Sequence, residues 1–313
     1  MVNAALLTLT TLASVHPCHR ISLTRRAAVG TALCGQCFLA PLTTWADAPL
    51  VPLCDQDVSV LTAAGRNDIV VIGTAHVSAE SAMLVRQVIR SVRPDTVMVE
   101  LDKPRAVALM RKAKARRNGD LVVSSTPPGQ HLTRGQAFYQ SLDTMGFEPG
   151  REFVAAIEEA RLINATVLLG DRDINVTLRR LQEAKAEVRR LRSEGVLSRD
   201  DAVEAARMLP KSLDRRNEEL TMESVTDMTA DLSQRESAVA VAEYMRRVAP
   251  PVYEAMIGER DRIMAHALRD APGKSVVGVV GLSHLEGIER ILADELGTRR
   301  VQLPGCPVVL SDN

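Results

Sequence analysis

The chain of 313 residues is poor in aromatic side chains and carries no net charge. Trp, Tyr and Phe make up 3% of the residues, and 39 basic residues are balanced by 39 acidic ones. Nucleic-acid-binding domains usually present a basic surface with stacking aromatics, so we expect no nucleic-acid partner. With so few aromatics, the core must consist of Val, Leu, Ile, Ala and Met.

Long apolar runs are also lacking in the carboxyl-terminal part of the chain. No stretch there approaches the roughly 20 apolar residues that a membrane-spanning helix requires. We therefore expect no transmembrane helix in the mature chain. Its length fits one domain with an insertion.

Acidic residues are missing from the amino end, where no Asp or Glu precedes Asp47. Ser, Thr, Ala and Leu dominate this segment, as in transit peptides. The pair Arg25-Arg26, the apolar stretch 27–42 and the Ala-Asp-Ala sequence at 46–48 are typical of a Tat-type export signal. We expect a targeting segment over residues 1–48, addressed to the chloroplast and then the thylakoid lumen. The alternative is a mitochondrial presequence.

Cysteine is scarce, with 5 in the chain. Cys34 and Cys37 form a Cys-x-x-Cys motif, but it lies inside the apolar export stretch, so we do not assign it a redox role. Processing would leave only Cys54 and Cys306. These two could form a disulfide, although nothing in the sequence requires one.

Two apolar runs, residues 69–72 and 276–280, each lead into a Gly-x-x-His turn. The turns begin at Gly73 and Gly281 and end at His76 and His284. A run that is apolar at every position predicts a strand buried on both faces. In open α/β sheets, ligand sites lie beyond the carboxyl ends of the strands, so the two histidines are candidate site residues.

A third expected strand, residues 96–99, is followed directly by Glu100, which should also lie beyond the carboxyl end of its strand. The segment before it has Val85, Val88 and Ile89 at helical spacing and stops before Pro94. A strand–helix–strand unit requires parallel pairing, so Glu100 and His76 should lie at one edge of the sheet. The alternative for Glu100 is an ion pair with Arg105.

A fourth expected strand, residues 166–169, follows a helix with an apolar stripe that includes Phe153 and Ile157. It is followed by Asp171 and Arg172, which we expect near the site. Asp173 is better explained as the cap of the next helix.

The helix before the last expected strand has an apolar face that we assign to Met256, Ile263, Met264 and Ala267. Glu259 and Arg260 share that face by their spacing. Charges on a buried face are costly unless paired. They form either a structural ion pair or a second shell that orients a histidine.

These motifs occur in the order found in TraB/PrgY-type proteins, which the chain resembles over roughly residues 58–300. The segments that carry the resemblance are Gly-Thr-Ala-His-Val-Ser (73–78), Val-Glu-Leu-Asp (99–102) with Arg105, Gly-Arg-Glu-Phe (150–153), Gly-Asp-Arg-Asp-Ile (170–174) with Thr-Leu-Arg-Arg (177–180), Glu-Arg-Asp (259–261) and Gly-Leu-Ser-His (281–284).

The resemblance implies an α/β fold with a mostly parallel sheet, flanking helices and a charged helical insertion. It also implies a site built from His76, Glu100 and His284. Tiki-like relatives are thought to be metal-dependent peptidases, whereas esterase relatives use His and Glu without metal. Bacterial members often end in membrane-spanning helices, a feature that we do not expect here.

The stretch 181–249 is rich in Arg, Glu, Ala and Leu and is expected to be helical, as an insertion into a domain spanning 49–313. It would form a solvated hairpin, a cap over the site or the arm of a homo-oligomer. The basic run 111–117 is expected to be a solvated helix face, with phosphate or membrane binding as the alternative.

The leading hypothesis is a hydrolase acting on a peptide or small-molecule substrate. His76, Glu100 and His284 would bind a divalent metal ion, with Asp171 as a further ligand or orienting group. The substrate carboxylate would be held by one of four arginines, namely Arg105, Arg172, Arg179 and Arg260. In a metal-free form, one His is the general base and Glu100 positions it. The alternative is a non-enzymatic haem- or metal-binding protein or an organelle adaptor.

Overall fold

The computed structural model describes residues 51–62, 68–75, 79–119, 149–213, 222–303 and 306. All of them belong to one compact unit, Trp45–Asn313. The expected targeting segment and His76 lie outside the described residues.

The described residues form a six-stranded sheet in the order β4-β3-β5-β2-β1-β6. The strands are β1 (Val58–Thr62), β2 (Asp68–Thr74), β3 (Thr96–Val99), β4 (Thr166–Leu169), β5 (Ser275–Gly281) and β6 (Arg299–Arg300). Strands β2, β5, β3 and β4 pair in parallel, whereas β1 is antiparallel to both β2 and β6. The α/β fold is confirmed, and the sheet is of mixed type.

Some helices flank the sheet, η2 precedes β1, and most of the others lie in or next to the insertion. The flanking helices are α1 (Ala79–Val92), α2 (Lys103–Arg117), α4 (Arg151–Leu162), α10 (Glu259–Arg269) and α11 (Leu282–Leu296). The other helical elements are η2 (Val51–Cys54), α5 (Ile174–Ser193), α6 (Arg199–Ala206), η3 (Lys211–Leu213), α7 (Met222–Leu232), α8 (Arg235–Val248), α9 (Pro250–Tyr253) and the π-helical turn η4 (Glu254–Gly258).

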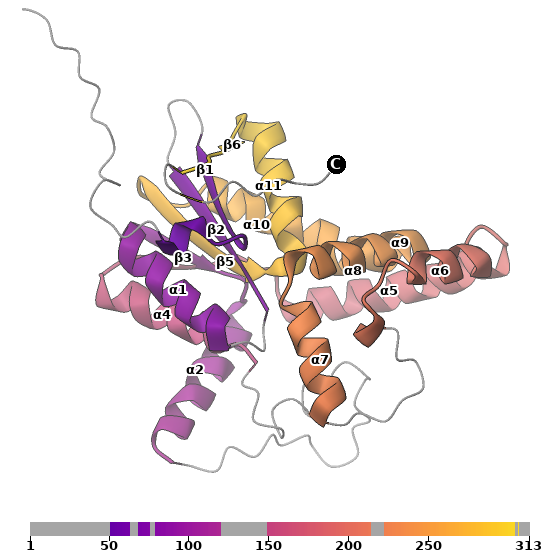
Figure 1. The fold of residues 1–313 in the computed structure, drawn as a ribbon, viewed down its shortest axis with the longest axis horizontal. Helices are drawn as coiled ribbons and strands as arrows, with labels where there is room; N and C mark the ends of the chain where they lie inside the picture. The colour runs from indigo at the N-terminus through magenta and orange to yellow at the C-terminus, as the bar shows by residue number, and fades with distance from the viewer. Residues whose placement is uncertain are drawn as a thin grey trace, which may run out of the picture. The chain divides into compact units, whose positions relative to one another are not determined.

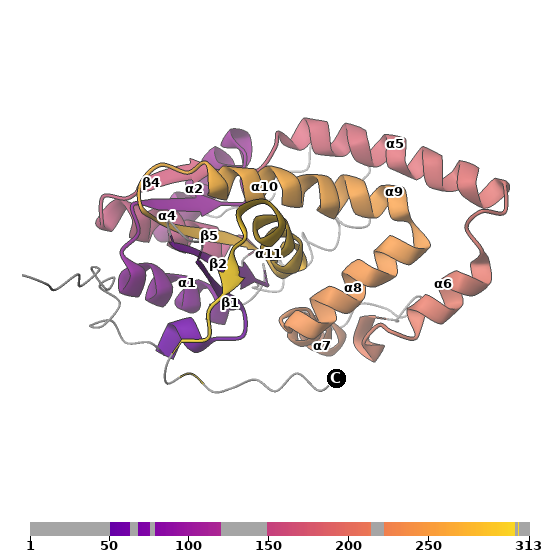
Figure 2. The same ribbon diagram turned by 90° about the horizontal axis from the view of Figure 1, so that it is seen from above.

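Two helical layers cover the sheet. Helices α1 and α4 pack on one face, and α10 and α11 pack on the other (Figures 1 and 2). The expected stripes of α1 and α4 are confirmed, since Val85, Ile89, Phe153 and Ile157 are all buried. Aliphatic side chains dominate both layers, as the scarcity of aromatics requires.

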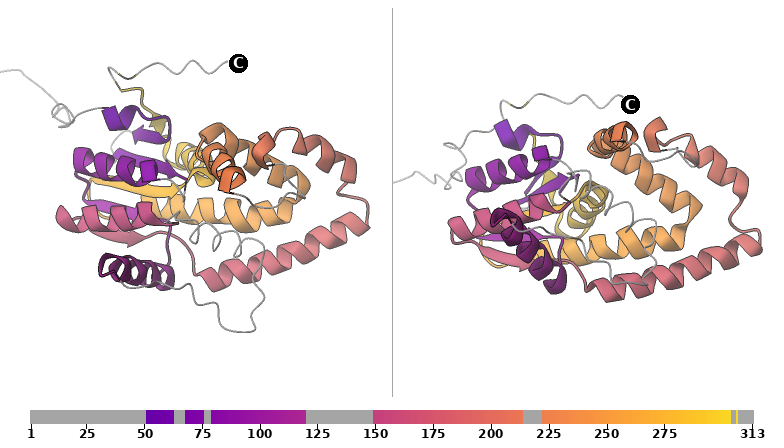
Figure 3. Two further views of the ribbon diagram at one scale, coloured as in Figure 1. Left: turned by 60° about the horizontal axis from the view of Figure 1, so that its bottom comes forward. Right: turned by 90° about the horizontal axis from the view of Figure 1, so that it is seen from below.

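The insertion is helical in the residues described. Gly195, with φ of 74°, takes the left-handed conformation that lets the chain turn after α5. Helix α5 runs beside α9 and the π turn, and α8 packs against α6 and α11 (Figure 3). Within the described ranges, no helix is long and apolar enough to cross a membrane.

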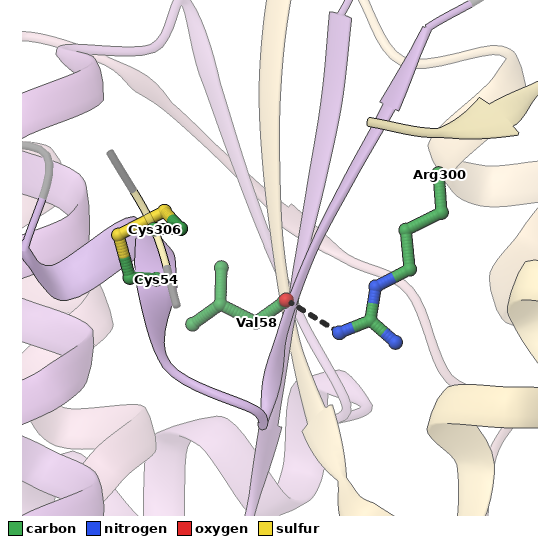
Figure 4. The surroundings of a disulfide bond; sticks show 4 residues. All are labelled: Cys54, Val58, Arg300 and Cys306. Carbon is green, nitrogen blue, oxygen red and sulfur yellow. Dashed lines mark hydrogen bonds between the residues drawn. A yellow bond between two sulfur atoms is a disulfide. The ribbon is translucent and has the colours of Figure 1, made fainter. Parts of the chain in front are cut away.

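The edge made by β1 and β6 was not expected from the sequence. The main-chain N–H of Val301 donates to the carbonyl of Val60, which continues the pairing beyond β6. A disulfide joins Cys54 to Cys306, and the guanidinium of Arg300 donates to the Val58 carbonyl at 3.3 Å (Figure 4). The sequence allowed a disulfide between Cys54 and Cys306 without requiring one, and the structure contains this disulfide.

The expected apolar face of α10 is shifted by one residue. Ile263 is 36% exposed, whereas Met264, Ala265 and Leu268 are buried against the sheet. The π turn just before α10 inserts one extra residue into the helical winding, so every later position is rotated by about 100°. The prediction for Ile263 was wrong for this reason.

Candidate active site

The four parallel strands bring charged residues to one edge of the sheet. Thr74 at the end of β2 is level with Gly281 at the end of β5, and Val99 of β3 is level with Leu169 of β4. Glu100, Asp171 and His284 follow these strands and lie at this edge. His76 follows β2 in sequence but is outside the described residues.

The side chain of Arg260 joins these groups from α10. Its Nε lies 3.1 Å from both carboxylate oxygens of Asp171, and its Nη2 donates to Asp171 and to Glu100. Its Nη1 lies 3.0 Å from Nε2 of His284. Arg260 is only 7% exposed, so its charge depends on these carboxylates for compensation.

Glu100 is fixed by a second donor. Its Oε2 accepts a 2.7 Å hydrogen bond from the main-chain N–H of Gly281, the residue at which β5 gives way to α11. The short turn after β3 thereby ties its carboxylate to the neighbouring strand. Arg105, the alternative partner expected for Glu100, donates to Asp102 and to Asp171.

His284 is held through both ring nitrogens. Nδ1 lies 2.6 Å from Oδ1 of Asp261, and the ring is buried. Nε2 faces both Nη1 of Arg260 at 3.0 Å and Oε1 of Glu100 at 3.4 Å. A neutral imidazole accepts from Arg260 at Nε2, and an imidazolium donates from Nε2 to Glu100. Both protonation states of His284 thus find a partner.

The surroundings favour the charged ring. Burial opposes the charge, but the nearby Glu100 carboxylate and the Asp261 hydrogen bond outweigh it and raise the pKa of His284 to about 9. Burial opposes ionisation of Asp171 as well, yet its bonds to Arg260 keep its pKa below the ordinary value. A protonated His284 lies between the carboxylates of Asp261 and Glu100, and Arg260 lies between those of Glu100 and Asp171.

The π turn positions this part of the site. In it, the N–H of Glu259 bonds to the Glu254 carbonyl, five residues back. The carbonyls of Ala255 and Met256 accept from the guanidinium groups of Arg172 and Arg260. The turn therefore holds two arginines through its main chain, in keeping with the frequent occurrence of π turns at functional sites.

Glu259 lies at the border of the site, where its carboxylate pairs with two arginines from the start of the insertion. Arg172 donates to one of its oxygens, and Arg180 donates to the other at 2.6 Å. The hydrogen bond from Arg180 and then that from Arg172 outweigh burial and lower the pKa of Glu259 to about 2. Of the expected arginines, Arg179 is exposed on α5 and is not brought to the cluster.

The arrangement of these side chains bears on the expected metal site. In the described part of the chain, no three His, Cys, Asp or Glu side chains are placed to hold a metal ion. Glu100 and Asp171, two of the expected ligands, are both bound to Arg260, and Nε2 of His284 faces Nη1 of the same guanidinium at 3.0 Å. The guanidinium stands where a cation shared by these carboxylates would have to sit, so the described residues do not fit a divalent ion.

Asp261 and Arg180 stand in motifs that carry the family resemblance, but neither was expected to have a role in the site. Asp261 was missed because straight helical spacing placed Glu259 and Arg260, not Arg260 and Asp261, on the buried face. Arg180 was passed over for its neighbour Arg179. Gly287 is the feature of the sequence that could have pointed to Asp261, because only glycine at this position of α11 leaves room for the Asp261 side chain.

The chain is similar in sequence to a known protein family and to several individual proteins. A model of the TraB/PrgY/gumN family matches residues 59–295. An uncharacterized protein of Methanocaldococcus jannaschii is 29% identical over 244 residues, which cover 75% of this chain and 56% of that protein. The human TraB domain-containing protein is 26% identical over 296 residues, covering 82% of this chain and 71% of its own length. The chain thus spans little more than half of the archaeal relative.

Proposed function

Because the chain belongs to the TraB/PrgY/gumN family, we propose that the charged edge of its sheet is the active site of a hydrolase acting on peptides. The observation that carries the proposal is Nε2 of His284, which faces a donor on Arg260 and an acceptor on Glu100. An atom with a partner in both protonation states is suited to giving and taking a proton. The peptide class rests on the resemblance to Tiki-like members.

In this proposal Glu100 accepts a proton from the attacking water, and the water oxygen bonds to the substrate carbonyl carbon. Protonated His284 gives its Nε2 proton to the leaving amine as the carbon–nitrogen bond breaks. The proton on Glu100 then returns to His284 across the 3.4 Å between Oε1 and Nε2, which resets the site. Asp261 holds the ring, and Arg260 stabilises the negative charge that develops on the carbonyl oxygen.

The competing explanation is that the cluster is a structural ion network inside a binding protein. Glu100 and His284 are 5% and 3% exposed, as structural networks often are. In that case, removing one partner unfolds the protein. In the hydrolase, a variant of the same shape folds and loses turnover.

Metal dependence is a second form of the proposal. It requires Arg260 to leave the space between Glu100 and Asp171, since both carboxylates are bound to it. The proton transfers among water, Glu100, His284 and the leaving amine do not themselves require a metal ion.

We also propose that the mature chain works outside the reducing cytosol, in the thylakoid lumen. The Cys54–Cys306 disulfide supports this location, because such bonds persist in oxidising compartments. The export features of residues 1–48 support it independently.

A digest of a peptide library by the purified full chain, read by mass spectrometry, tests the proposal. Reactions with a chelator and with added zinc or manganese run in parallel. Cleavage that survives the chelator supports the proton-transfer mechanism. Cleavage that is lost and then restored by a divalent ion supports the metal form. Absence of cleavage under all conditions overturns the hydrolase and leaves the binding protein.

A further inference from the structure

A basic pocket of about 390 Å³ lies where residues of α1, α2 and α4 come together (Figure 1 shows α2 below α1 and α4). Its volume falls within the range of small-molecule sites, roughly 300–1,000 Å³. None of the charged side chains gathered around Arg260 lines it, so it is separate from the candidate active site.

Two helices turn one face each toward the pocket. The lining residues of α2 follow one another at intervals of three or four, in the order Leu109, Lys112, Ala113, Arg116 and Arg117. Helix α4 contributes three residues with the same spacing, namely Arg151, Val154 and Glu158. Residues spaced in this way share one side of a helix, so the pocket lies between two helix faces. Arg86 of α1 adds a further basic side chain.

Positive charge predominates in the pocket. Of the described residues that line it, five are basic and one is acidic, and α2 itself contains no Asp or Glu. Lys112, Arg116 and Arg151 each have an interaction within the protein. An arginine carries five N–H donors and a lysine three, so a side chain with one partner can still donate to a ligand. Cations held this close repel one another, and a bound anion would relieve the repulsion.

Glu158 positions two of the arginines. Its Oε1 lies 2.6 Å from Nη1 of Arg117, and its Oε2 lies 3.5 Å from Nη2 of Arg86. The side chain of Glu158 is 22% exposed, whereas those of Arg86 and Arg117 are 35% and 60% exposed. The carboxylate thus lies deeper than the guanidinium groups that it holds. Groups of arginines arranged side by side are a common means of recognising phosphoryl groups.

The wall between the basic groups is apolar. It consists of Leu109, Ala113 and Val154, with Pro149 at the start of α4. Such a wall can contact the organic part of a ligand while the cations hold its anionic part. No aromatic side chain lines the pocket in the part of the chain that the structure describes, so nothing there would stack on a nucleobase.

We propose that the pocket binds a phosphate monoester, either a soluble one or the headgroup of a lipid. At neutral pH this group carries about 1.5 to 2 negative charges and three acceptor oxygens, more than a single carboxylate offers to five cations. The inference goes beyond the proposed function, because no residue of the pocket takes part in the proposed hydrolysis. The competing interpretation is that α2 is only a solvated basic helix.

Two measurements with the full chain separate the sources of the phosphate. Isothermal titration calorimetry with glycerol 3-phosphate tests a soluble ester, and glycerol is its uncharged counterpart. Sedimentation with phosphatidylcholine vesicles, with and without phosphatidic acid, tests a lipid headgroup.

Each measurement compares two double variants that remove one Lys and one Arg from α2. Lys112→Gln/Arg116→Gln changes the pocket, and Arg111→Gln/Lys114→Gln changes exposed positions of the same helix that do not line it. We expect the pocket variant to bind roughly tenfold or more weakly than the wild type, because it loses charge-assisted hydrogen bonds. The control variant should bind as the wild type does.

Binding of glycerol 3-phosphate with this pattern supports a soluble ester, and binding to vesicles alone with this pattern supports a lipid headgroup. Binding of neither probe overturns the proposal. An equal loss in the two double variants also overturns it, because the overall charge of α2 would then hold the anion. If circular dichroism shows that the pocket variant unfolds, Arg117→Gln, at a 60% exposed side chain, gives the same comparison against Arg111→Gln.

Discussion

Asp261 bonds to Nδ1 of His284 at 2.6 Å, and it can do so only because position 287 on the facing helix is glycine. A Cβ on residue 287 would lie 2.0 Å from Oδ2 of Asp261, far inside van der Waals contact. Helices α10 and α11 therefore approach closely enough for the carboxylate to orient the imidazole. The orientation of His284 depends on this close approach as much as on its own turn.

Gly287→Ala should push Asp261 away from His284. Overpacking of a buried contact typically costs about 1–3 kcal/mol of unfolding free energy, and hydrolysis should fall as well because the ring loses its fixed orientation. Urea unfolding and peptide turnover measure the two effects. Glu286→Ala, at the exposed neighbouring position, is the control and should change neither. Wild-type stability in Gly287→Ala would show that the helices are not packed as described.

The raised pKa of His284 predicts a pH-dependent stability. In the unfolded chain His titrates near 6.5, and in the folded protein the pKa of His284 is about 9. The stabilisation from the protonated ring is complete below pH 6.5 and is lost as the pH rises through 9. The loss is on the order of 3 kcal/mol for a shift of this size.

Unfolding free energies measured between pH 6 and pH 10 test this directly. The unfolding free energy of the wild-type protein should fall across that range. That of His284→Gln should change less with pH, because this variant has no imidazole to titrate at position 284. Arg262→Gln, a substitution at an exposed position of α10, is the matched control and should keep the wild-type slope. Equal slopes in wild type and His284→Gln would mean that folding does not shift the pKa of His284.

The disulfide should stabilise the fold without taking part in the chemistry. It links residues 252 positions apart and ties η2 to the chain beyond β6, away from His284. Replacing Cys54 and Cys306 by Ser should cost roughly 2–5 kcal/mol, the range for removal of a native disulfide. The melting temperature of the wild type should fall in a thiol reductant, and that of the double variant should not. A wild-type protein that is indifferent to reductant would argue that this bond does not form.

The parallel strands and the charged residues that follow them could be predicted from the sequence. Each strand is a continuous apolar run that ends in Gly or a charged residue. The proximity of Glu100, Asp171 and His284 followed from parallel pairing alone. The edge formed by β1 and β6 could not be predicted in the same way. Strand β6 has only two residues, and Ser59 interrupts the apolar run of β1 while being buried against Glu289.

The register of α10 shows a different limit. Spacing rules assume 3.6 residues per turn, and the π turn before Glu259 breaks that assumption by one residue. The shift moves Asp261 onto the buried face and Ile263 off it. A pattern of Glu-Arg-Asp followed by a helical stripe holds no local signal for such a turn, so only the structure reveals Asp261 as the partner of His284.

The pair Glu100→Gln and His284→Gln offers the most direct test of the central claim, which is that this edge of the sheet carries out hydrolysis. Each substitution keeps a hydrogen-bonding side chain but removes the proton transfer. Turnover of a library-derived peptide should fall by roughly 10²–10⁴ in each variant while circular dichroism stays native. Full turnover in either folded variant, or unfolding of both, would contradict the account, the first because the reaction lies elsewhere and the second because the network is structural.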